Sequence, residues 1–580
     1  MPEYLAPGVF VEETSFRAKS IEGVGTSTAA FVGLTSRGPR AGQQGDPMPT
    51  LLTSFVDFEQ IFGGVDDLRI NNAPVPNYLA HAARAFFANG GGRLYVARVL
   101  AQGGKAGEMI INAGVADAKK QVGFAARSNG GALIANSDAN FRVVVRQNLL
   151  KTTKRLALKQ QPGTMLRTPV NNKPDEYFVL GSDDADTAFK KLDLDGSSEI
   201  VTFGVEVYDP SGLVYEANGL GLDSRHSRYI KMILGASPPQ LRDRLSNPVM
   251  IVVGDSVLPQ DLRDLLVKDL KAEDLPAGKL CALIGGSDGA GDPGGYDKAL
   301  DVLLALEDIA IVAAPGLSSF AGIAADVNQK LIGHAEARRA YRIAVLDPPA
   351  NLEPGEIADI KGKIDSTRAA LYYPWITVAN PLAGTDPTQP SQLDLPPSGH
   401  VCGIYARTDI QRGVWKAPAN ETVTGAIDLQ RAVAFGEQEK LNPLGVNCIR
   451  ALPNRGIRVW GARTISSDPE WKYVSVRRYF LYLENSIDRG TQWAVFEPNG
   501  EALWTNVRTT ISDFLYNEWV NGALLGATPK EAFFVHCDRS TMTQNDLDNG
   551  RLICLIGVAA IKPAEFVIFR IGQKTADARG

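Results

Sequence analysis

The sequence predicts a multidomain α/β and α+β protein, in which layered α/β core domains carry an inserted, mostly β domain and extended strand arms at both ends. Three observations support this prediction. Apolar runs alternate with amphipathic helical patterns between residues 248 and 381, short β-like runs separated by polar stretches fill residues 102–240, and each end of the chain carries a short apolar run. Alternating strands and helices are typical of a sheet covered by helices. With 580 residues, the chain is also longer than one core requires.

The first hundred residues predict an arm and the beginning of a core domain. A short extended run at residues 9–13 precedes a strand pattern at 28–34. Helical spacing of apolar residues over 75–88 ends at three consecutive glycines, and a second strand pattern follows at 93–99.

The middle of the chain contains two regions with different patterns of apolar residues. Between 102 and 240 the β-like runs at 141–147 and 199–209 stand among polar stretches, which predicts a separate β domain inserted into the chain. Beyond it, continuous apolar runs without alternation indicate strands buried on both faces of one sheet. We expect strands at 249–254, 279–285, 309–315, 341–347 and 375–381, and helices at 260–271, 297–306, 320–337 and 356–371.

The last third of the chain predicts an α+β domain and a terminal strand. Its clearest helix spans 503–525, where only Glu518 interrupts the apolar stripe. The run at 565–571 is apolar on both faces of a predicted strand. The predicted divisions are 1–35 for the first arm, 36–101 for the start of the core, 102–244 for the inserted β domain, 245–385 for the α/β domain, 386–562 for the C-terminal domain and 563–580 for the last arm.

Composition excludes several classes of protein. Hydrophobic residues make up 44% and charged residues 22%, with 60 basic against 65 acidic side chains. Such a balance predicts no electrostatic grip on nucleic acid or on an anionic membrane. The five cysteines form no CxxC pair, which indicates a reducing compartment. The beginning of the chain resembles no signal peptide, and its longest apolar run near the end, at 552–561, is about half of the ~20 residues that a bilayer requires. We expect a cytoplasmic protein.

One glycine-rich loop suggests an alternative function. Residues 289–294, within the loop at 285–296, match GxGxxG between a strand and a helix, so an α/β nucleotide-binding enzyme is the competing interpretation. The loop has already run through several residues before the first glycine, and Pro293 lies inside the motif, so a dinucleotide site is disfavoured. We expect a surface connection here.

Metal and catalytic sites are not predicted anywhere. The five histidines occur in neither an HExxH nor a CxxC context, and the pair His536 and Cys537 cannot close a tetrahedral site alone. We therefore expect no catalytic residue, no cofactor and no metal, and a protein that is not an enzyme.

Several segments together resemble the contractile tail sheath protein family. The resemblance includes APGVFVEET at residues 6–14, IEGVGTSTAAFVGLTSRGP at 21–39 and AARAFFANGGGRLYVARV at 82–99. Its most specific part is NPLGVNCIRALPNRGIRVWGARTISSDPEWKYVSVRRYFLYLENSI at 442–487, and it continues through 523–571. Residues 102–240 match nothing in the family, where the corresponding domain lies on the outer surface of the sheath and varies in size.

The resemblance implies a structural protein that polymerises helically around an inner tube and contracts to drive the tube through a target envelope. It implies as partners other copies of the chain and paralogous sheath subunits, the tube protein, and baseplate and terminal cap proteins, without nucleic acid or membrane insertion. It also implies assembly in the cytoplasm, as part of a phage tail or a released phage-like injection particle. The extended opening and the long inserted domain favour the particle.

Two sets of residues are the predicted contacts. The apolar runs at the ends of the chain should link subunits by strand pairing, because an exposed apolar strand is an aggregation hazard unless another chain pairs with it. These residues are Val9, Phe10, Val11, Glu12, Phe566, Val567, Ile568 and Phe569. Arg508, on the predicted helix at 503–525, is the candidate contact with the inner tube.

Overall fold

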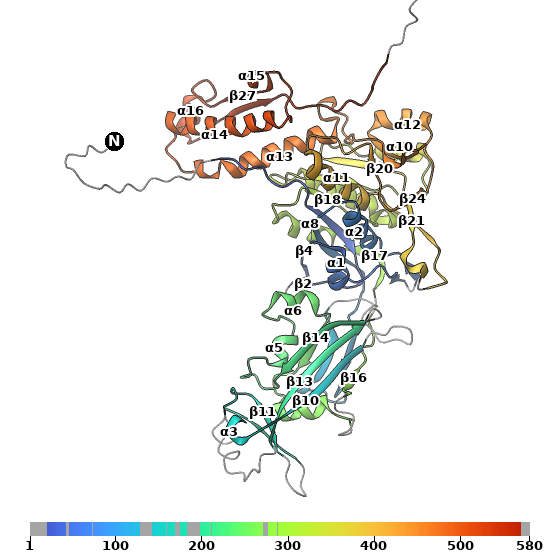
Figure 1. Cartoon of the computed structure of the whole chain (residues 1–580), viewed down its shortest axis with the longest axis vertical. Helices are drawn as coiled ribbons and strands as arrows, with labels where there is room; N and C mark the ends of the chain where they lie inside the picture. Colours follow the sequence, from blue (N-terminus) through green and yellow to red (C-terminus); the bar gives the residue numbers. More distant parts are fainter. Residues whose placement is uncertain are drawn as a thin grey trace, which may run out of the picture. The chain divides into compact units, whose positions relative to one another are not determined.

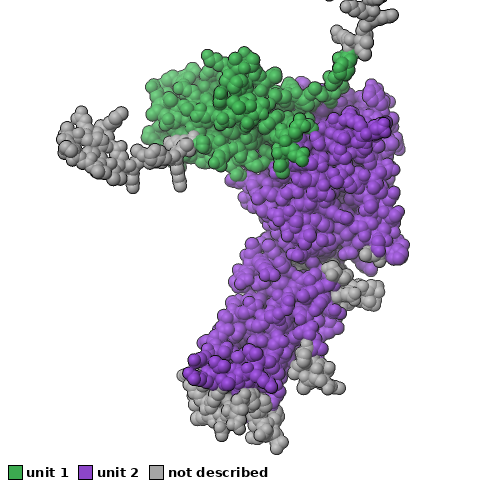
Figure 2. Space-filling view, viewed as in Figure 1, with its two compact units in different colours: residues 1–26, 409–417, 473–580 green, residues 27–408, 418–472 purple. Residues whose placement is uncertain are grey.

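The computed structural model describes residues 20–41, 46–71, 73–127, 142–157, 159–168, 175–181, 198–209, 212–270, 277–286, 288–384 and 386–569. The chain forms two compact units, each discontinuous in sequence (Figure 2). Unit 1 comprises residues 1–26, 409–417 and 473–580, and unit 2 comprises residues 27–408 and 418–472.

A ten-stranded sheet forms the centre of unit 2 (Figure 1). Its order is β17 (Ala290–Gly294), β7 (Leu94–Gln102), β1 (Ala29–Leu34), β18 (Ile311–Ala313), β19 (Ile343–Leu346), β20 (Ala369–Tyr373), β25 (Val446–Leu452), β26 (Gly456–Val459) and β23 (Glu421–Thr422), with β4 (Thr50–Leu52) also paired to β7. From β7 to β25 the neighbours are parallel, whereas β4, β17, β23 and β26 pair antiparallel. Parallel neighbours need crossover connections, which agrees with the alternating strand and helix patterns.

Helices cover both faces of this sheet. They are α1 (Phe55–Phe62), α2 (Tyr78–Ala88), α8 (Tyr296–Leu304), α9 (Ala321–Glu336), α10 (Pro354–Lys361), α11 (Ser398–Arg412) and α12 (Phe435–Leu441). Ala30 and Val32 of β1 join a buried cluster with α8 and α9. Phe31 points the other way and packs edge-to-face on Phe86 of α2, with ring centroids 5.8 Å apart. Alternate residues of one strand thus enter two different layers.

The structure corrects two predictions within the α/β part. The helix expected at 356–371 ends at Lys361 in α10, and its last residues instead form the buried strand β20. The strand expected at 375–381 exists as β21 (Ile376–Ala379), but it belongs to a separate sheet with β22 (Gln392–Leu395) and β24 (Ala426–Leu429). Two small ribbons complete this part, β2 (Arg40–Ala41) with β3 (Asp46–Pro47) and β5 (Leu68–Ile70) with β6 (Ala73–Val75).

The chain between β7 and β17 forms a mostly β part of unit 2. A six-stranded sheet has the order β12 (Glu176–Val179), β11 (Met165–Thr168), β13 (Ser198–Asp209), β10 (Arg142–Thr152) and β16 (Lys279–Cys281), and β14 (Gly212–Leu220) also pairs with β13. A three-stranded sheet has the order β15 (Val249–Val253), β9 (Val122–Ala126) and β8 (Glu108–Ile110). The described residues of this part also form the helices α3 (Lys154–Ala157), α5 (Ile230–Leu234), α6 (Leu241–Ser246) and α7 (Pro259–Leu266).

Two predicted strands belong to this β-rich part and not to the parallel sheet. The strands expected at 249–254 and 279–285 were placed in the α/β layer, but β15 pairs with β9 and β16 pairs with β10. Their buried side chains join one hydrophobic cluster that extends in sequence from Val122 to Leu283. An apolar run indicates that a strand is buried, but it does not indicate the sheet to which the strand belongs.

Unit 1 is built on two long helices, α13 (Val474–Gly490) and α14 (Glu501–Val520), which lie side by side (Figure 1). It also contains α15 (Pro529–Ala532), β27 (Phe533–His536), α16 (Gln544–Asp548) and β28 (Leu555–Val558). Glu518, the charged residue in the predicted apolar stripe, is buried and accepts hydrogen bonds from Tyr479 (3.2 Å) and Tyr482 (2.9 Å) of α13. Burial raises the pKa of this carboxyl. Across the described ranges, none of the helices combines the length and apolar character that a membrane crossing requires.

Candidate functional site

The last described residues of the chain present an unusual apolar surface. Phe566, Val567, Ile568 and Phe569 are 70%, 69%, 78% and 83% exposed, and residues 561–569 have no regular secondary structure. The expected strand at 565–571 is therefore not formed in its described part, because a lone segment has no neighbour for its backbone hydrogen bonds. The other predicted arm residues, Val9, Phe10, Val11 and Glu12, lie outside the described residues.

The chain leading to this apolar segment is fixed to unit 1. The N–H of Leu525 donates to the carbonyl of Ala559 (2.8 Å), and the N–H of Ala559 donates to the carbonyl of Ala532 (2.8 Å). Further along, the Tyr473 hydroxyl donates to Glu565 Oε2 over 3.1 Å. The apolar residues thus begin directly after an anchored point.

The first described residues are fixed to the same unit, along α13. The N–H of Val24 donates to Ser486 Oγ over 3.1 Å. A Cβ on Gly23 would lie 2.1 Å from the Tyr482 hydroxyl, and a Cβ on Gly490 would lie 2.5 Å from Ile21. The segment and α13 therefore pack closely, and the side chains of Tyr482 and Ile21 fill the space beside these two glycines.

A buried ion pair also holds the first described residues against α13. Arg478 of α13 bonds both carboxylate oxygens of Asp409, at 2.8 and 2.6 Å, and the two side chains are each 3% exposed. The carbonyl of Thr26 accepts a further hydrogen bond from Arg478 (3.0 Å), and the Thr26 hydroxyl donates to Asp409 (2.7 Å). This group could not be predicted from the sequence, because its members are far apart in the chain. The only local sign was Arg477-Arg478 inside an otherwise amphipathic helix.

The hairpin of β27 and β28 lies in the same unit. These strands form a two-stranded sheet, and within the described residues neither has another partner. Phe534 and Leu555 are exposed large apolar side chains on this hairpin. A two-stranded ribbon is marginal by itself and presents backbone donors and acceptors at both edges.

Arg508, the predicted tube contact, lies on α14 and is half-buried. Hydrogen bonds from Ser540 lower the pKa of Asp538, just beyond the end of β27, and the positive charge of Arg508 lowers it further. On the side of α14 opposite its apolar stripe, Asn506, Asp513 and Asn517 are exposed, whereas Thr510 is buried.

The glycine-rich segment has a different structure from the surface connection that was expected. Residues 290–294 form β17, an edge strand that pairs antiparallel with β7 through an irregular register. Proline is tolerated at a sheet edge, which explains Pro293 inside a strand. Gly295, with φ 88°, follows it and is the N-cap residue of α8.

Burial favours the neutral form of three histidines in the interior. Burial lowers the pKa of His81 and His400 to about 4 and that of His334 to about 3. Among the described residues there is no group of three or more His, Cys, Asp or Glu side chains that could hold a metal ion.

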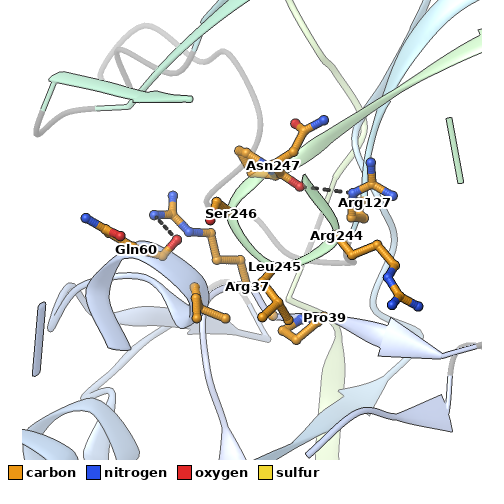
Figure 3. Close-up of a pocket in the computed structure, with 11 residues that line it drawn as sticks. Arg37, Pro39, Gln60, Arg127, Arg244, Leu245, Ser246 and Asn247 are labelled. Carbon is orange, nitrogen blue, oxygen red and sulfur yellow. Dashed lines mark hydrogen bonds between the residues drawn. The ribbon is translucent and has the colours of Figure 1, made fainter. Parts of the chain in front are cut away.

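A small cavity lies beside Arg37, Arg127 and Asn247 (Figure 3). Its volume is about 10 Å³, room for no more than one water molecule. Arg37 pairs with Asp209 at 3.1 Å and donates to the carbonyl of Gln60, and Arg127 donates to the carbonyl of Asn247. These arginines tie chain segments together and leave no space for a ligand larger than water.

Comparison with known families assigns most of the second half of the chain. A model of the phage tail sheath protein central domain matches residues 292–465, and a model of the phage tail sheath C-terminal domain matches residues 466–574. The chain belongs to the contractile tail sheath family. One relative, described as a prophage major tail sheath protein of Pseudomonas aeruginosa (strain UCBPP-PA14), is 27% identical over 307 residues, which cover 52% of this sheath protein and 75% of the relative. The tail sheath protein of Escherichia phage P2 is 24% identical over 43% of this chain and 62% of its own length.

Solved structures show the same fold over nearly the whole chain. The helical sheath of the anti-feeding prophage in its contracted state has a TM-score of 0.52 at 21% identity, covering 98% of this sheath protein and 100% of that chain. A sheath tail protein from Desulfitobacterium hafniense has a TM-score of 0.52 at 12% identity, over 91% and 93% of the two chains. The sheath complex of an extracellular contractile injection system, PVC, has a TM-score of 0.50 at 20% identity, over 99% of both chains. The relatives are structural sheath components, and this chain is a sheath protein.

Proposed function

We propose that this sheath protein polymerises helically around an inner tube and contracts to drive the tube through a target envelope. The observation that carries the proposal is that unit 1 anchors both ends of the described chain and holds the two-stranded ribbon β27–β28. In this proposal the two chain ends that leave unit 1 act as strand-forming arms, and the ribbon β27–β28 acts as the acceptor sheet. A head-to-tail contact of this kind, repeated without closure, generates a helical assembly.

Pairing of arms from neighbouring subunits satisfies several groups at once. The exposed residues 566–569 would gain a strand partner, and the free edges of β27 and β28 would gain a neighbour. Each backbone hydrogen bond contributes only ~0.5–1.5 kcal/mol net, so one short pairing is weak. Over a lattice, release of one subunit requires several pairings to break together, and the assembly becomes long-lived.

The same linkage suits contraction. Arms that pair outside the domain bodies hold neighbours together while the bodies slide from an extended lattice to a shorter, wider one. A kinetic barrier keeps the sheath in its extended state until contraction is triggered, so contraction needs no bound nucleotide. This agrees with the glycine-rich segment being an edge strand. The enzyme alternative has no observation in its favour.

The partners follow from this role. The chain would bind copies of itself, a tube protein, and baseplate and cap proteins, and Arg508 with the exposed polar residues of α14 is the proposed tube surface. The β-rich part between β7 and β17 would decorate the outside of the sheath. Assembly would take place in the cytoplasm, and the extended opening and the long inserted domain favour a phage-like particle over a phage tail.

Truncation of the last arm tests the proposal. A chain that ends at Ala564 should fold and yet form no long sheaths, because the apolar arm is missing. Circular dichroism would establish folding, and negative-stain microscopy would count tubes. The matched control ends at Ile571 and loses only the polar residues 572–580, so it should assemble normally. Removal of residues 1–14 should repeat the defect of the first truncation. Normal long tubes from both arm truncations would contradict the proposal.

Charge reversal at Arg508 separates tube binding from sheath assembly. Arg508→Glu should lower the amount of tube protein that copurifies with sheaths, while sheath length stays unchanged. Arg412→Glu is the control, since Arg412 is also an exposed arginine of unit 1 but lies on α11, a different helix. Equal tube occupancy in both variants would remove α14 from the tube contact.

A further inference from the structure

Two cysteines meet at the end of the β27–β28 hairpin. Cys537 follows the last residue of β27, and Cys554 precedes the first residue of β28. The antiparallel register pairs His536 with Leu555, so the next opposed pair in the same register is Cys537 and Cys554. Their side chains are close enough to share a hydrogen bond, and both are free thiols in this structure.

The backbone places these thiols where a disulfide can form. Opposed residues of antiparallel strands have Cα atoms about 4.5–5.5 Å apart, and a disulfide spans Cα separations of about 4.4–6.8 Å. A bond between them would therefore need side-chain rotation and little backbone movement. Cys281 and Cys448 do not form a similar pair with each other, since they lie in two different hydrophobic clusters of unit 2.

Access and reactivity differ between the two thiols. Cys537 is 1% exposed, whereas Cys554 is partly exposed and can meet a dissolved reagent. Burial raises the pKa of both thiols, that of Cys554 to about 12, so thiolate is scarce at neutral pH. Arg508 is the positive charge that favours the thiolate of Cys537, and Asp538 opposes it. The pair consequently reacts slowly, and a reducing compartment keeps it open.

We propose that Cys537 and Cys554 are a dithiol–disulfide pair that closes when the protein meets a small-molecule disulfide such as oxidised glutathione. The Cys554 thiolate attacks the glutathione disulfide, forms a mixed disulfide and releases one glutathione thiolate. The Cys537 thiolate then attacks the Cys554 sulfur, the intramolecular bond forms, and the second glutathione thiolate leaves. The protein loses two protons and two electrons in total, and the oxidant gains the electrons.

Closure of the bond would fix the loop at 538–553, which includes α16. In the reduced protein this loop is held by local bonds, such as the Thr541 hydroxyl to the carbonyl of Ile553 (2.9 Å) and the N–H of Arg551 to the carbonyl of Asp546 (2.8 Å). A cross-link across its base restricts how far the loop and the hairpin end can open. This inference concerns the hairpin of one chain and does not depend on the proposed sheath function.

Mass spectrometry tests the pair directly. The purified full chain would be incubated with oxidised glutathione at mildly alkaline pH, then denatured, alkylated and digested without reduction. We expect an intact mass lower by two hydrogen atoms and one cross-linked peptide joining Cys537 to Cys554. Cys281→Ser, a buried cysteine in the β-rich part, is the matched control and should form the same cross-link. Cys554→Ser and Cys537→Ser should each abolish it.

Hydrogen exchange gives a second, independent readout. In the oxidised protein, amide exchange within 538–553 should slow by at least about tenfold relative to the reduced protein, and Cys554→Ser should show no such change. A glutathione adduct that persists on Cys554, or five alkylated thiols after prolonged oxidation, would show that Cys537 and Cys554 do not form a disulfide. A cross-link without slower exchange would overturn its role in fixing the loop.

Discussion

At the scale of single residues, Asp347 ties the end of β19 to the beginning of α11. Its Oδ1 accepts the N–H of Ser398 (2.8 Å), and its Oδ2 lies 2.5 Å from the Ser398 hydroxyl oxygen. Burial raises the pKa of this carboxyl from 3.8 to about 7, although the two hydrogen bonds favour the charged form. The neutral acid is therefore the form that the folded protein prefers over much of the acidic range.

This pKa shift predicts a pH dependence of stability. Between pH 3.8 and about 7 the folded protein keeps a proton that the unfolded chain releases. The free energy of unfolding should therefore fall as pH rises through this window, by up to about 4 kcal/mol from this group, and should level off above it. Asp347→Asn mimics the neutral acid and should flatten the curve in urea unfolding across this range. Asp359→Asn, an exposed carboxylate, should leave the slope unchanged; equal slopes for all three proteins would contradict the assignment.

The ion pair between Arg478 and Asp409 gives the second residue-scale prediction. Arg478→Met should lower the free energy of unfolding by about 3–5 kcal/mol, because it leaves a carboxylate buried without its partner. It should also expose the chain around Thr26 to proteases, since Arg478 bonds the Thr26 carbonyl. Arg551→Met is the control in the same unit: Arg551 pairs with Asp546 at the surface, and its loss should cost less than about 1 kcal/mol. Similar losses in both variants would show that burial of the pair does not matter.

At the scale of elements, α2 and α11 pack at an approach that only glycine allows. A Cβ on Gly403 would lie 2.5 Å from the carbonyl oxygen of Phe86, and one on Gly399 would lie 2.6 Å from Cα of Ala82. Both contacts are with backbone, which cannot rotate away as a side chain can. The helices would have to separate to accept a methyl group.

Gly403→Ala should therefore destabilise unit 2 by about 1–3 kcal/mol or more. Gly333→Ala is its matched control, because Gly333 lies inside α9 and a Cβ there would meet open space. That variant should be more stable by roughly 0.5–1 kcal/mol, through the better helix propensity of alanine. Thermal unfolding of the two variants would compare them, and the same sign of change in both would contradict close packing.

Several elements could be predicted from sequence because their signals are local. The strands β1, β7, β18 and β19 stand out as apolar runs, and α14 stands out by its stripe of apolar residues. The helix expected at 356–371 was wrong beyond Lys361, since apolar residues buried on both faces of β20 also satisfy a helical spacing over so short a stretch. β17 could not be predicted, because a run of Gly, Asp and Pro has low strand propensity and pairs only where β7 offers an edge.

For the candidate assembly segments, too, features set by adjacent residues could be predicted from the sequence, whereas contacts between distant residues could not. Residues 566–569 could be named from sequence, since four adjacent apolar side chains near a chain end are conspicuous. Their anchors could not be. Glu565 meets Tyr473, and Val24 meets Ser486, across long stretches of chain. Such contacts depend on how unit 1 is assembled from three separate segments, and no local pattern encodes them.

At the scale of the whole molecule, the β-rich part is an insertion between two paired strands. The chain leaves the core sheet at the end of β7 and returns in β17, and Gln102 and Ala290 are opposed across that pair. The two ends of the insertion are therefore adjacent, as in a β-hairpin. Strands β15 and β16 lie within the insertion, so a cut that ends before residue 249 would divide one hydrophobic cluster.

These facts predict two different outcomes for two deletions. Removing residues 104–287 and joining Gly103 to Asp288 through Asn-Gly should close a short hairpin and leave the core folded, because loops of two to five residues suit such a connection. Removing only residues 104–240 should give aggregated protein, since β15, α7 and β16 would lose the strands that bury Val249, Ile251 and Leu262. The longer deletion also removes Asp209, but Arg37 keeps the carbonyls of Glu59 and Gln60 as partners.

Size-exclusion chromatography would separate monomer from aggregate, and microscopy would show whether the longer deletion still forms tubes. If the longer deletion were folded but remained monomeric, the β-rich part would have to belong to the sheath lattice.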